Sequence, residues 1–524
     1  MKSDKLSDAI GMIDADLIVQ ADEKVKKGKV EYLKWLIPVA AVFLIVIAII
    51  PFLKQDKPKV DKPSVEQLTS LDEQSTNDGN NLNNQAPSTE LNGNEPSTEK
   101  PTSQTITPSA DDNPLLPKVY SLSLARYPKT VKYPSDWSNM TAWEESRKER
   151  RAYYGAGKNL DVFFKKTYME FLTGAGKNNK LYSPLNVYMA LAMTAEITGG
   201  ESRQQILSLL GAESIEALRK QANSVWNANY SDDGAVTSIL ASSIWLDKNV
   251  KFNENTLQFL TSNYYASSYQ GQMGSNEMNK ALQGWLNQQT GGLLSDRISD
   301  IELDAQTIMA LATTIFYQAR WNAEFNEEYT SKRTFHSPSG DVTCDFMNRK
   351  EYGETYYWGD SFSAVGRRLA NSGRMFFILP DENVSVDALL RDSEALSFMT
   401  SNGKWSQNKK ININLSIPRF DASSNCDLVQ NLKNLGVVNC FNSVKSDFSP
   451  LCENKGISIS KVEHGVRVAI DEEGVVATAY TVEALAGSTR PPEEEIDFIV
   501  DRPFIFVITS EDGLPLFTGV INQP

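Results

Sequence analysis

Apolar positions recur at helical and strand spacing over most of the chain beyond residue 158. Asn159–Leu172 carries an apolar stripe at helical spacing, and Met278–Ile301 is an amphipathic run that contains a Thr-Gly-Gly stop. Ser238–Leu246 and Phe498–Ile508 are runs rich in strand-forming residues. The pattern predicts a folded region that mixes helices with buried strands.

A different pattern fills the N-terminal region. Residues 1–34 are charged and modestly amphipathic, and we expect a short cytoplasmic segment. Residues 35–53 follow without a charged side chain; as a helix this run would span roughly 28 Å, close to the thickness of a hydrocarbon core. The run is apolar on every face, which disfavours a buried soluble helix, and no small-residue cleavage site follows it, which disfavours a signal peptide. We therefore expect a transmembrane helix.

The next segment, residues 54–118, is rich in Ser, Thr, Asn, Asp, Glu and Pro, and contains no aromatic residue. Such a segment cannot bury enough apolar surface to fold, so we expect a disordered linker. Lysines flank the apolar run on both sides, so the tendency of positive charges to stay in the cytoplasm scarcely favours either orientation of the helix. The polar linker favours a cytoplasmic N-terminus and a folded domain outside a single-pass cell membrane. An uncleaved anchor followed by a tether is typical of a bacterial surface protein.

Residues 119–157 hold Tyr, Trp and many charges, and are expected to pack as an N-terminal extension on the edge of the folded domain, residues 158–524. The formal net charge of −14 argues against a nucleic-acid partner. Only four Cys and two His are present, without a CxxC pair, so neither a metal site nor a cofactor is expected. Free buried thiols are the favoured state of the cysteines, with a Cys440–Cys452 disulfide as the alternative.

One stretch near the C-terminus, Asp471–Pro492, has the composition of a strand and the ending of a loop. It begins acidic, turns at Gly474 and continues through small, apolar and hydroxyl side chains, with no proline before Pro491. Its Val, Thr and Tyr residues favour a strand, although a polar turn follows at residues 486–490. This stretch resembles the hinge and reactive-centre loop of the serpins, a family of serine protease inhibitors.

Further motifs support the resemblance from about residue 142 onward. A Ser-Pro opens an apolar run within Leu181–Met193, a strand, a Trp turn and a Phe-His follow in order within Leu311–His336, and a Pro-Arg-Phe run lies within Ile411–Asp447. The resemblance implies an α+β serpin fold. That fold has a large five-stranded central sheet, two further sheets, about eight or nine helices and an exposed reactive-centre loop.

The resemblance also assigns roles by position. Counting from Gly474 places the reactive bond between Ser488 and Thr489, and the neighbouring reactive-loop subsites are Leu485, Ala486, Gly487 and Arg490. The hinge comprises Glu472, Glu473, Gly474, Val475, Val476, Ala477, Thr478 and Ala479. The region where the central sheet opens comprises Ser183, Asn186, Thr313, His464, Trp321 and Arg419.

Specific contacts are expected within this set. A buried imidazole needs partners on both nitrogens, and for His464 the matching positions offer Asn186 and Thr313. At the entrance to the sheet we expect an ion pair between Arg419 and Glu472, with a tryptophan packed nearby.

No residue set fits a catalytic centre, because a GxSxG elbow is absent and His336 and His464 are expected to be structural. We therefore expect no enzyme. The resemblance implies a suicide-substrate inhibitor of extracellular serine proteases. Cleavage of the loop 474–492 would give a 1:1 covalent acyl-enzyme complex, and the loop would insert as a strand.

Two features refine this expectation. The side chains before the reactive bond are small, which suits the shallow specificity pocket of an elastase-like target. The chain is expected to act as a monomer. By period-2 alternation Glu483 would face the core late in insertion, where a carboxylate is costly. The alternative is therefore a non-inhibitory serpin-fold binding or adhesion module on the cell surface.

Overall fold

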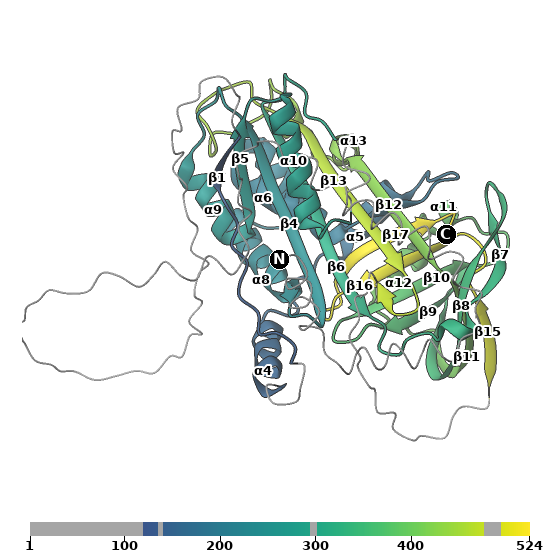
Figure 1. Cartoon of the computed structure of the whole chain (residues 1–524). Helices are drawn as coiled ribbons and strands as arrows, with labels where there is room; N and C mark the ends of the chain where they lie inside the picture. Colours follow the sequence, from purple (N-terminus) through teal and green to yellow (C-terminus); the bar gives the residue numbers. More distant parts are fainter. Residues whose placement is uncertain (1–118, 135–139, 294–300, 476–493) are drawn as a thin grey trace, which may run out of the picture. The chain divides into compact units, whose positions relative to one another are not determined.

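A computed structural model describes residues 119–134, 140–293, 301–475 and 494–524 (Figure 1). The predicted cytoplasmic segment, transmembrane helix and linker, residues 1–118, lie outside these ranges. No helix in the described ranges is long and apolar enough to cross a membrane.

The central sheet has eight strands, of which five are the long strands of the expected sheet. Its order is β1 (Tyr120–Ser123), β5 (Ala266–Gly271), β4 (Val236–Asp247), β6 (Met309–Arg320), β14 (Gly474–Val475), β13 (Ile459–Ile470) and β12 (Phe420–Asp427), with β3 (Ser231–Asp232) paired to β4. The three additional strands, β1, β3 and β14, are short. Strand β1 comes from the N-terminal extension, and strand β14 comes from the predicted hinge.

The second sheet has nine strands and replaces the two separate sheets that were expected. Its order is β15 (Glu495–Ile499), β11 (Asn408–Pro418), β8 (Gly340–Trp358), β9 (Phe362–Arg368), β10 (Arg374–Pro380), β16 (Phe504–Thr509), β17 (Pro515–Ile521) and β2 (Lys180–Tyr182), with β7 (Ser331–Ser337) paired to β8. The two further sheets that were expected are continuous with each other, because the long strand β8 pairs with β7 and β11 and, at its end, with β9. The expected single strand at 498–508 is two strands, interrupted at Pro503, which has no N–H to donate.

The described residues contain ten α-helices, more than the expected eight or nine. They are α4 (Met140–Arg151), α5 (Asp161–Leu172), α6 (Pro184–Ile197), α7 (Gly200–Leu210), α8 (Ile215–Asn229), α9 (Glu254–Tyr264), α10 (Asn276–Gln289), α11 (Val386–Leu389), α12 (Ser393–Thr400) and α13 (Val429–Asn434). The surplus arises because the extension forms α4 and because α11 is a single four-residue turn. Two 3-10 turns, η3 (Glu327–Tyr329) and η4 (Asn439–Phe441), complete the set.

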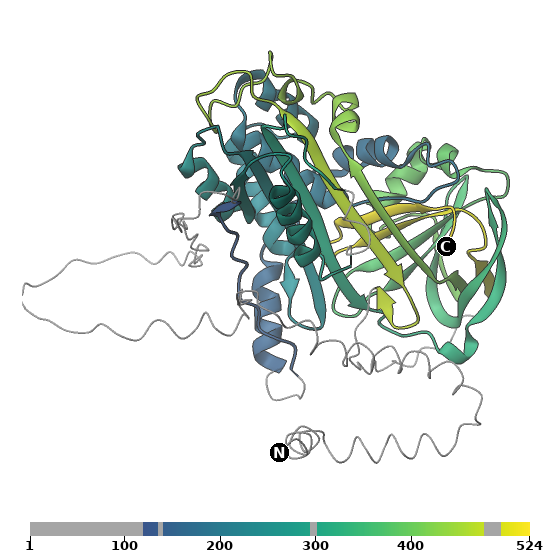
Figure 2. The same cartoon turned by 45° about the horizontal axis from the view of Figure 1, so that its top comes forward.

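Helices cover both faces of the central sheet (Figures 1 and 2). On one face α10 packs Leu282 and Trp285 against Trp245 of β4 and Ala312 of β6. On the other face lies α6, all of whose residues are buried. The sheet therefore has a core on each side, and a strand added to it would be buried on both faces.

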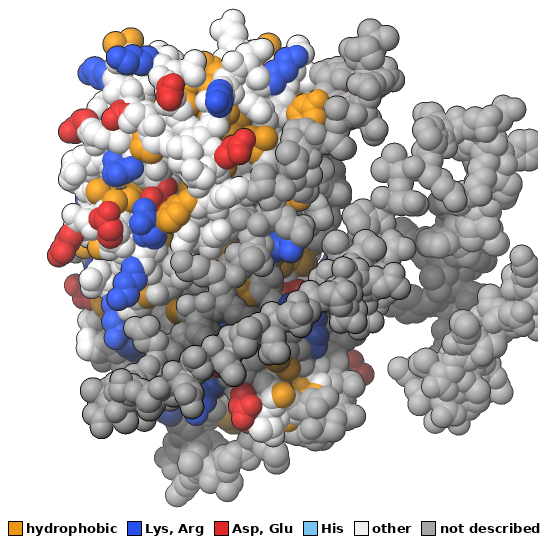
Figure 3. Space-filling model, turned by 90° about the vertical axis from the view of Figure 1, so that its left-hand side faces the viewer, with side chains coloured by type: hydrophobic (Ala, Val, Ile, Leu, Met, Phe, Trp, Pro, Cys, Tyr) orange, Lys and Arg blue, Asp and Glu red, His pale blue; other side chains and the backbone are white. Residues whose placement is uncertain are grey.

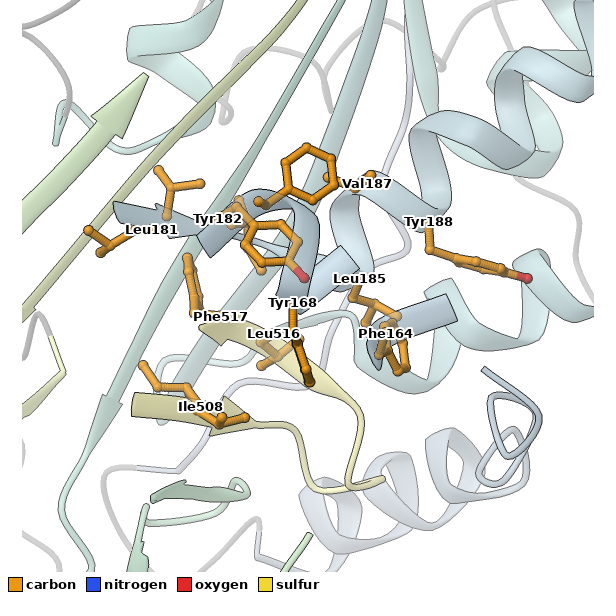
Figure 4. Close-up of a cluster of buried hydrophobic side chains, with 14 of the residues drawn as sticks. Phe164, Tyr168, Leu181, Tyr182, Leu185, Val187, Tyr188, Ile508, Leu516 and Phe517 are labelled. Atoms are coloured by element: carbon orange, nitrogen blue, oxygen red, sulfur yellow. The ribbon is translucent and has the colours of Figure 1, made fainter. Parts of the chain in front are cut away.

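The largest core joins the start of the domain to its end. Side chains from α5, β2 and α6 meet those of β16 and β17 in Figure 4, where the labelled residues are Phe164, Tyr168, Leu181, Tyr182, Leu185, Val187, Tyr188, Ile508, Leu516 and Phe517. Phe171 and Tyr182 stack with ring centroids 4.9 Å apart. Burial of this apolar surface stabilises the second sheet against α5 and α6.

The charges on one face of the molecule and the four cysteines bear on possible ligand sites. Basic and acidic side chains are interspersed over the visible part of the face in Figure 3. All four cysteines are free; Cys440 and Cys452 are buried, whereas Cys344 and Cys426 are partly exposed, so the expectation of buried thiols is wrong for the latter two. Within the described part of the chain, no group of His, Cys, Asp and Glu could hold a metal ion.

Candidate functional site at the opening of the central sheet

The candidate site lies in the middle of the central sheet, where β6 and β13 part. The two strands are parallel neighbours as far as Thr314 and Gly465. Farther along, β14 lies between them and is antiparallel to both, so that Val475 pairs with Ala319 of β6 and with Ile470 of β13. The Val475 side chain is 1% exposed and belongs to the main core. Gly474 and Val475 of the predicted hinge are therefore already part of the sheet.

A tight turn, Asp471–Gly474, carries the chain from β13 into β14. The Asp471 carboxylate accepts hydrogen bonds from the backbone N–H groups of Glu473 and Gly474, at 2.9 and 3.0 Å. A Cβ atom at position 474 would lie 2.4 Å from the carbonyl oxygen of Ala319 and 2.6 Å from the Cα atom of Arg320. Glycine is therefore required here by the close approach of two backbones.

Two ion pairs hold the acidic residues of the turn. Nη2 of Arg419 lies 2.7 Å from Oε2 of Glu472, as expected, and Nη2 of Arg320 lies 3.2 Å from Oε2 of Glu473. Oε2 of Glu472 accepts no hydrogen bond within the described residues, so its contact with Arg419 is an ion pair without hydrogen-bond geometry. Thr330 donates to the other oxygen of Glu472 at 2.7 Å. The Arg419 side chain is 46% exposed, which limits the pair to about 1 kcal/mol.

Trp321 holds the same turn through hydrogen bonds as well as by packing. Its indole N–H donates to the carbonyl oxygen of Asp471 at 2.8 Å, and its backbone N–H donates to the carbonyl oxygen of Glu473 at 2.9 Å. The side chain is 2% exposed. The guanidinium of Arg367 lies 5.3 Å from its ring centroid. Trp321 therefore joins the end of β6 to the entrance of the predicted hinge.

The polar cluster below the closed part of the sheet is centred on His464. The backbone N–H of Ser183 donates to its Nε2 atom at 3.0 Å, and Oγ1 of Thr313 lies 3.0 Å from its Nδ1 atom. Because Nε2 accepts, the neutral ring carries its proton on Nδ1 and donates it to Thr313. Complete burial lowers the pKa of His464 to about 3, so the ring is neutral at physiological pH.

Asn186 does not join this cluster through its side chain, contrary to expectation. The second nitrogen of His464 is satisfied by the backbone of Ser183, the N-cap residue of α6, whose own hydroxyl accepts from the backbone N–H of Asn186 at 3.2 Å. Both side-chain polar atoms of Asn186 are buried, and neither has a hydrogen-bond partner among the described residues. A buried amide without partners costs roughly 1–3 kcal/mol.

The remaining predicted site residues lie outside the described ranges. They are Val476, Ala477, Thr478 and Ala479 of the hinge, Leu485, Ala486, Gly487 and Arg490 of the subsites, and Ser488 and Thr489 of the reactive bond.

Three residues that hold the turn were missing from the sequence prediction. Asp471 carries a recognisable signal, because aspartate followed three residues later by glycine favours a turn closed by the carboxylate. Thr330 and Arg320 carry no such signal. Their partners are distant in sequence, 142 residues away for Thr330 and 153 for Arg320.

Comparison with known proteins identifies the fold and the family. The family model described as "Serpin (serine protease inhibitor)" matches residues 159–524, and the chain therefore belongs to the serpin family. Serpin-ZX of Arabidopsis thaliana is 28% identical over 372 residues, which cover 67% of this chain and 94% of that protein. The leukocyte elastase inhibitor of Homo sapiens is 26% identical over 356 residues, which cover 66% of this chain and 93% of that protein.

Solved structures agree with this assignment. AtSerpin1 of Arabidopsis in its native stressed conformation has a TM-score of 0.62 at 25% identity, and the match covers 72% of this chain and 98% of that one. The thermophilic serpin tengpin in its native state has a TM-score of 0.62 at 23% identity, and the match covers 76% of this chain and 98% of that one, which supports the fold alone.

Proposed function

We propose that this chain is a suicide-substrate inhibitor of serine proteases, whose reactive loop 474–492 inserts into the central sheet after cleavage. The observation that carries this proposal is β14, which already lies as a two-residue strand between β6 and β13. The direct pairing of β6 with β13 ends at Thr314 and Gly465. The loop therefore has a started strand and two neighbouring strands along which to continue.

The reaction proceeds through the target protease. Its serine oxygen attacks the carbonyl carbon of Ser488, the C–N bond to Thr489 breaks, and the new amine leaves with a proton supplied by the protease. The protease is then joined to Ser488 as an ester. Insertion of the loop carries the enzyme away and distorts its catalytic geometry, which removes the positioning that hydrolysis of the ester requires.

The proposed target is an extracellular, elastase-like protease, because the residues before the reactive bond are small and neutral. Residues 35–53 would anchor the inhibitor in a bacterial cell membrane, with the polar linker 54–118 holding the domain outside the cell. The complex would contain one inhibitor monomer and one protease molecule. The apolar run, the linker composition and the family membership support this arrangement.

The test is to mix the purified full chain with elastase and to look for a complex that survives SDS. A Ser488→Arg variant is expected to inhibit trypsin at least about tenfold faster than the wild type, because the charged pocket of trypsin-like enzymes discriminates strongly at this position. The matched control is Arg490→Ser, which should leave elastase inhibition in place. If no protease forms a stable complex and elastase cuts elsewhere in the loop, the proposal is wrong.

A second candidate function is a non-inhibitory binding or adhesion module with the same fold. Glu483 favours it, because a carboxylate that must enter the core opposes insertion. Clean cleavage of the loop without a covalent complex would support this second function.

A further inference from the structure

The N-terminal extension is bound along the edge of the central sheet and to a helix beside it. Strand β1 pairs with β5 and forms the last strand of the sheet on that side. Past β1, Oγ of Ser123 lies 2.5 Å from Oγ1 of Thr261 in α9, and the backbone N–H of Ala125 donates to the hydroxyl of Ser267 in β5 at 3.1 Å. The extension is therefore fixed to β5 and to α9 before it reaches Tyr127.

Tyr127 is the aromatic anchor of the extension. Its ring centroid lies 5.7 Å from those of Trp226 in α8 and Tyr230 directly after α8, and 6.3 Å from that of Tyr265 at the end of α9. Trp226 is fully buried, and the Tyr230 hydroxyl donates to the carbonyl oxygen of Pro128 at 3.1 Å. These contacts fasten Tyr127 to helices that pack with α6, on the face of the sheet opposite to α10.

The hydroxyl of Tyr127 joins this anchor to α10. It donates to Oε1 of Gln289, the last residue of that helix, at 2.9 Å. Val119, at the start of the described extension, packs against the core beneath α10, as does Tyr269 of β5. The extension thus connects helices on one face of the central sheet to the helix that covers the other face.

The chain that leaves α10 lies over the place where β6 and β13 part. A Cβ atom at Gly291 would lie 2.7 Å from the ring of Phe316 in β6, and the carbonyl oxygen of Leu293 accepts a hydrogen bond from Arg467 in β13. Phe316 and Arg467 both lie two residues past the last direct pair of the two strands. A strand that entered here would separate β6 and β13 by one more strand spacing, about 4.8 Å. The segment after α10 could not keep both contacts without moving.

We propose that the N-terminal extension is a strap, which holds the C-terminal end of α10 over the opening between β6 and β13 and so slows the entry of a strand. Because Tyr127 is fastened to α8 and α9, displacement of the end of α10 would break its hydrogen bond to Gln289. The restraint on α10 is independent of the proposed function, whereas its effect on the trapping of a protease rests on that function.

The experiment compares the full-length wild type with Tyr127→Phe, which keeps the ring and removes the donor, with Gln289→Met, which removes the acceptor, and with the double variant. The first readout is hydrogen exchange over the last turn of α10, residues 286–289. Each single variant should exchange about two- to tenfold faster there, the effect of one hydrogen bond, and the double variant no faster than either. The second readout is the rate of formation of an SDS-stable complex with elastase, which should rise in the same order.

The matched control is Tyr265→Phe, which removes a hydroxyl from the same aromatic cluster. That hydroxyl donates to Oδ1 of Asn227 in α8 at 3.3 Å and makes no contact with α10. Exchange in α10 should therefore match that of the wild type. Unchanged exchange in Tyr127→Phe, or equal acceleration in Tyr265→Phe, would overturn the strap.

The two readouts separate the strap from the proposed function. Faster exchange in α10 with an unchanged rate of complex formation would overturn the effect of the strap on strand entry and leave inhibition intact. If neither the wild type nor any variant forms a complex, the proposed function is wrong, and hydrogen exchange alone decides whether the extension restrains α10.

Discussion

At the residue scale, His464 connects the central sheet to the helix beneath it. It accepts a hydrogen bond from the backbone of Ser183 at the start of α6, and it donates one to Thr313 on the neighbouring strand. The contact with Ser183 requires an unprotonated Nε2 atom, and burial supplies it by lowering the pKa of His464 to about 3. Insertion of a strand between β6 and β13 would separate His464 from Thr313, so this hydrogen bond stabilises the closed sheet.

This residue should make stability depend on pH. Between pH 6.5 and about 3 the unfolded chain binds a proton at His464 that the folded chain does not, so acidification in this window lowers the free energy of unfolding by up to about 1.4 kcal/mol per pH unit. We expect His464→Gln to lose this part of the slope, because glutamine can still accept from Ser183 but does not titrate. Denaturant unfolding at pH 7.5, 6 and 5 measures it. Parallel slopes in both proteins would contradict the assignment.

At the element scale, the hinge strand β14 depends on one close approach of backbones. The Asp471–Gly474 turn reverses the chain, and position 474 has no room for a side chain against Ala319 of β6. Trp321 and the ion pairs of Glu472 and Glu473 hold the same turn. The strand is therefore held at its start, where insertion would begin.

Gly474→Ala should detach β14 from β6, because the added Cβ would meet backbone atoms that have little freedom to move. We expect a loss of about 1–3 kcal/mol in stability and faster hydrogen exchange at the Val475 amide. The matched control is Gly284→Ala in α10, where no atom lies within 4 Å of the added Cβ, and where alanine should stabilise by up to about 1 kcal/mol. Unchanged exchange at Val475 in Gly474→Ala would contradict the close approach.

The sequence predicts the long helices and strands of this fold, but it does not predict how distant strands pair into sheets. Runs such as Asn159–Leu172 and Ser238–Leu246 have periodicity that local sequence carries, and they form α5 and β4. The joining of the two expected minor sheets by β8 depends on pairings with distant strands, which no local pattern records. At the site, the resemblance to the serpins predicts the ion pair between Arg419 and Glu472. It does not predict the partner of the Nε2 atom of His464, because that partner is the backbone N–H of Ser183 and not the side chain of Asn186. A contact made by a backbone group cannot be recognised from the type of side chain.

At the scale of the whole domain, the N-terminal extension joins the two sheets. Its strand β1 pairs with β5 at one edge of the central sheet. Its helix α4 directs Arg147, Arg150 and Arg151 at Glu511, in the turn between β16 and β17, at 2.8, 3.2 and 2.5 Å. Burial would raise the pKa of Glu511, but hydrogen bonds from Arg147 and Arg151 outweigh it and hold the pKa below its ordinary value.

Glu511→Gln should loosen α4, because three arginines lose their shared carboxylate and remain close together. We expect a loss of about 1–3 kcal/mol in stability and faster hydrogen exchange over Met140–Arg151. In the wild type the contribution of Glu511 is present above the unfolded pKa of a glutamate and is lost as the pH falls through the lowered folded pKa. The exposed Glu382→Gln is a matched control and should change neither quantity. Unchanged exchange in Glu511→Gln would show that Trp143 and its neighbours suffice to hold the helix.

The central claim is that the reactive loop enters the sheet between β6 and β13. A crystal structure of the loop-cleaved protein tests it most directly, through the separation of Thr314 and Gly465, which are adjacent partners before cleavage. Insertion of a strand would increase that separation from about 4.8 Å to about 9.6 Å, the difference between one and two strand spacings. A cleaved structure in which Thr314 and Gly465 remain paired would contradict the account.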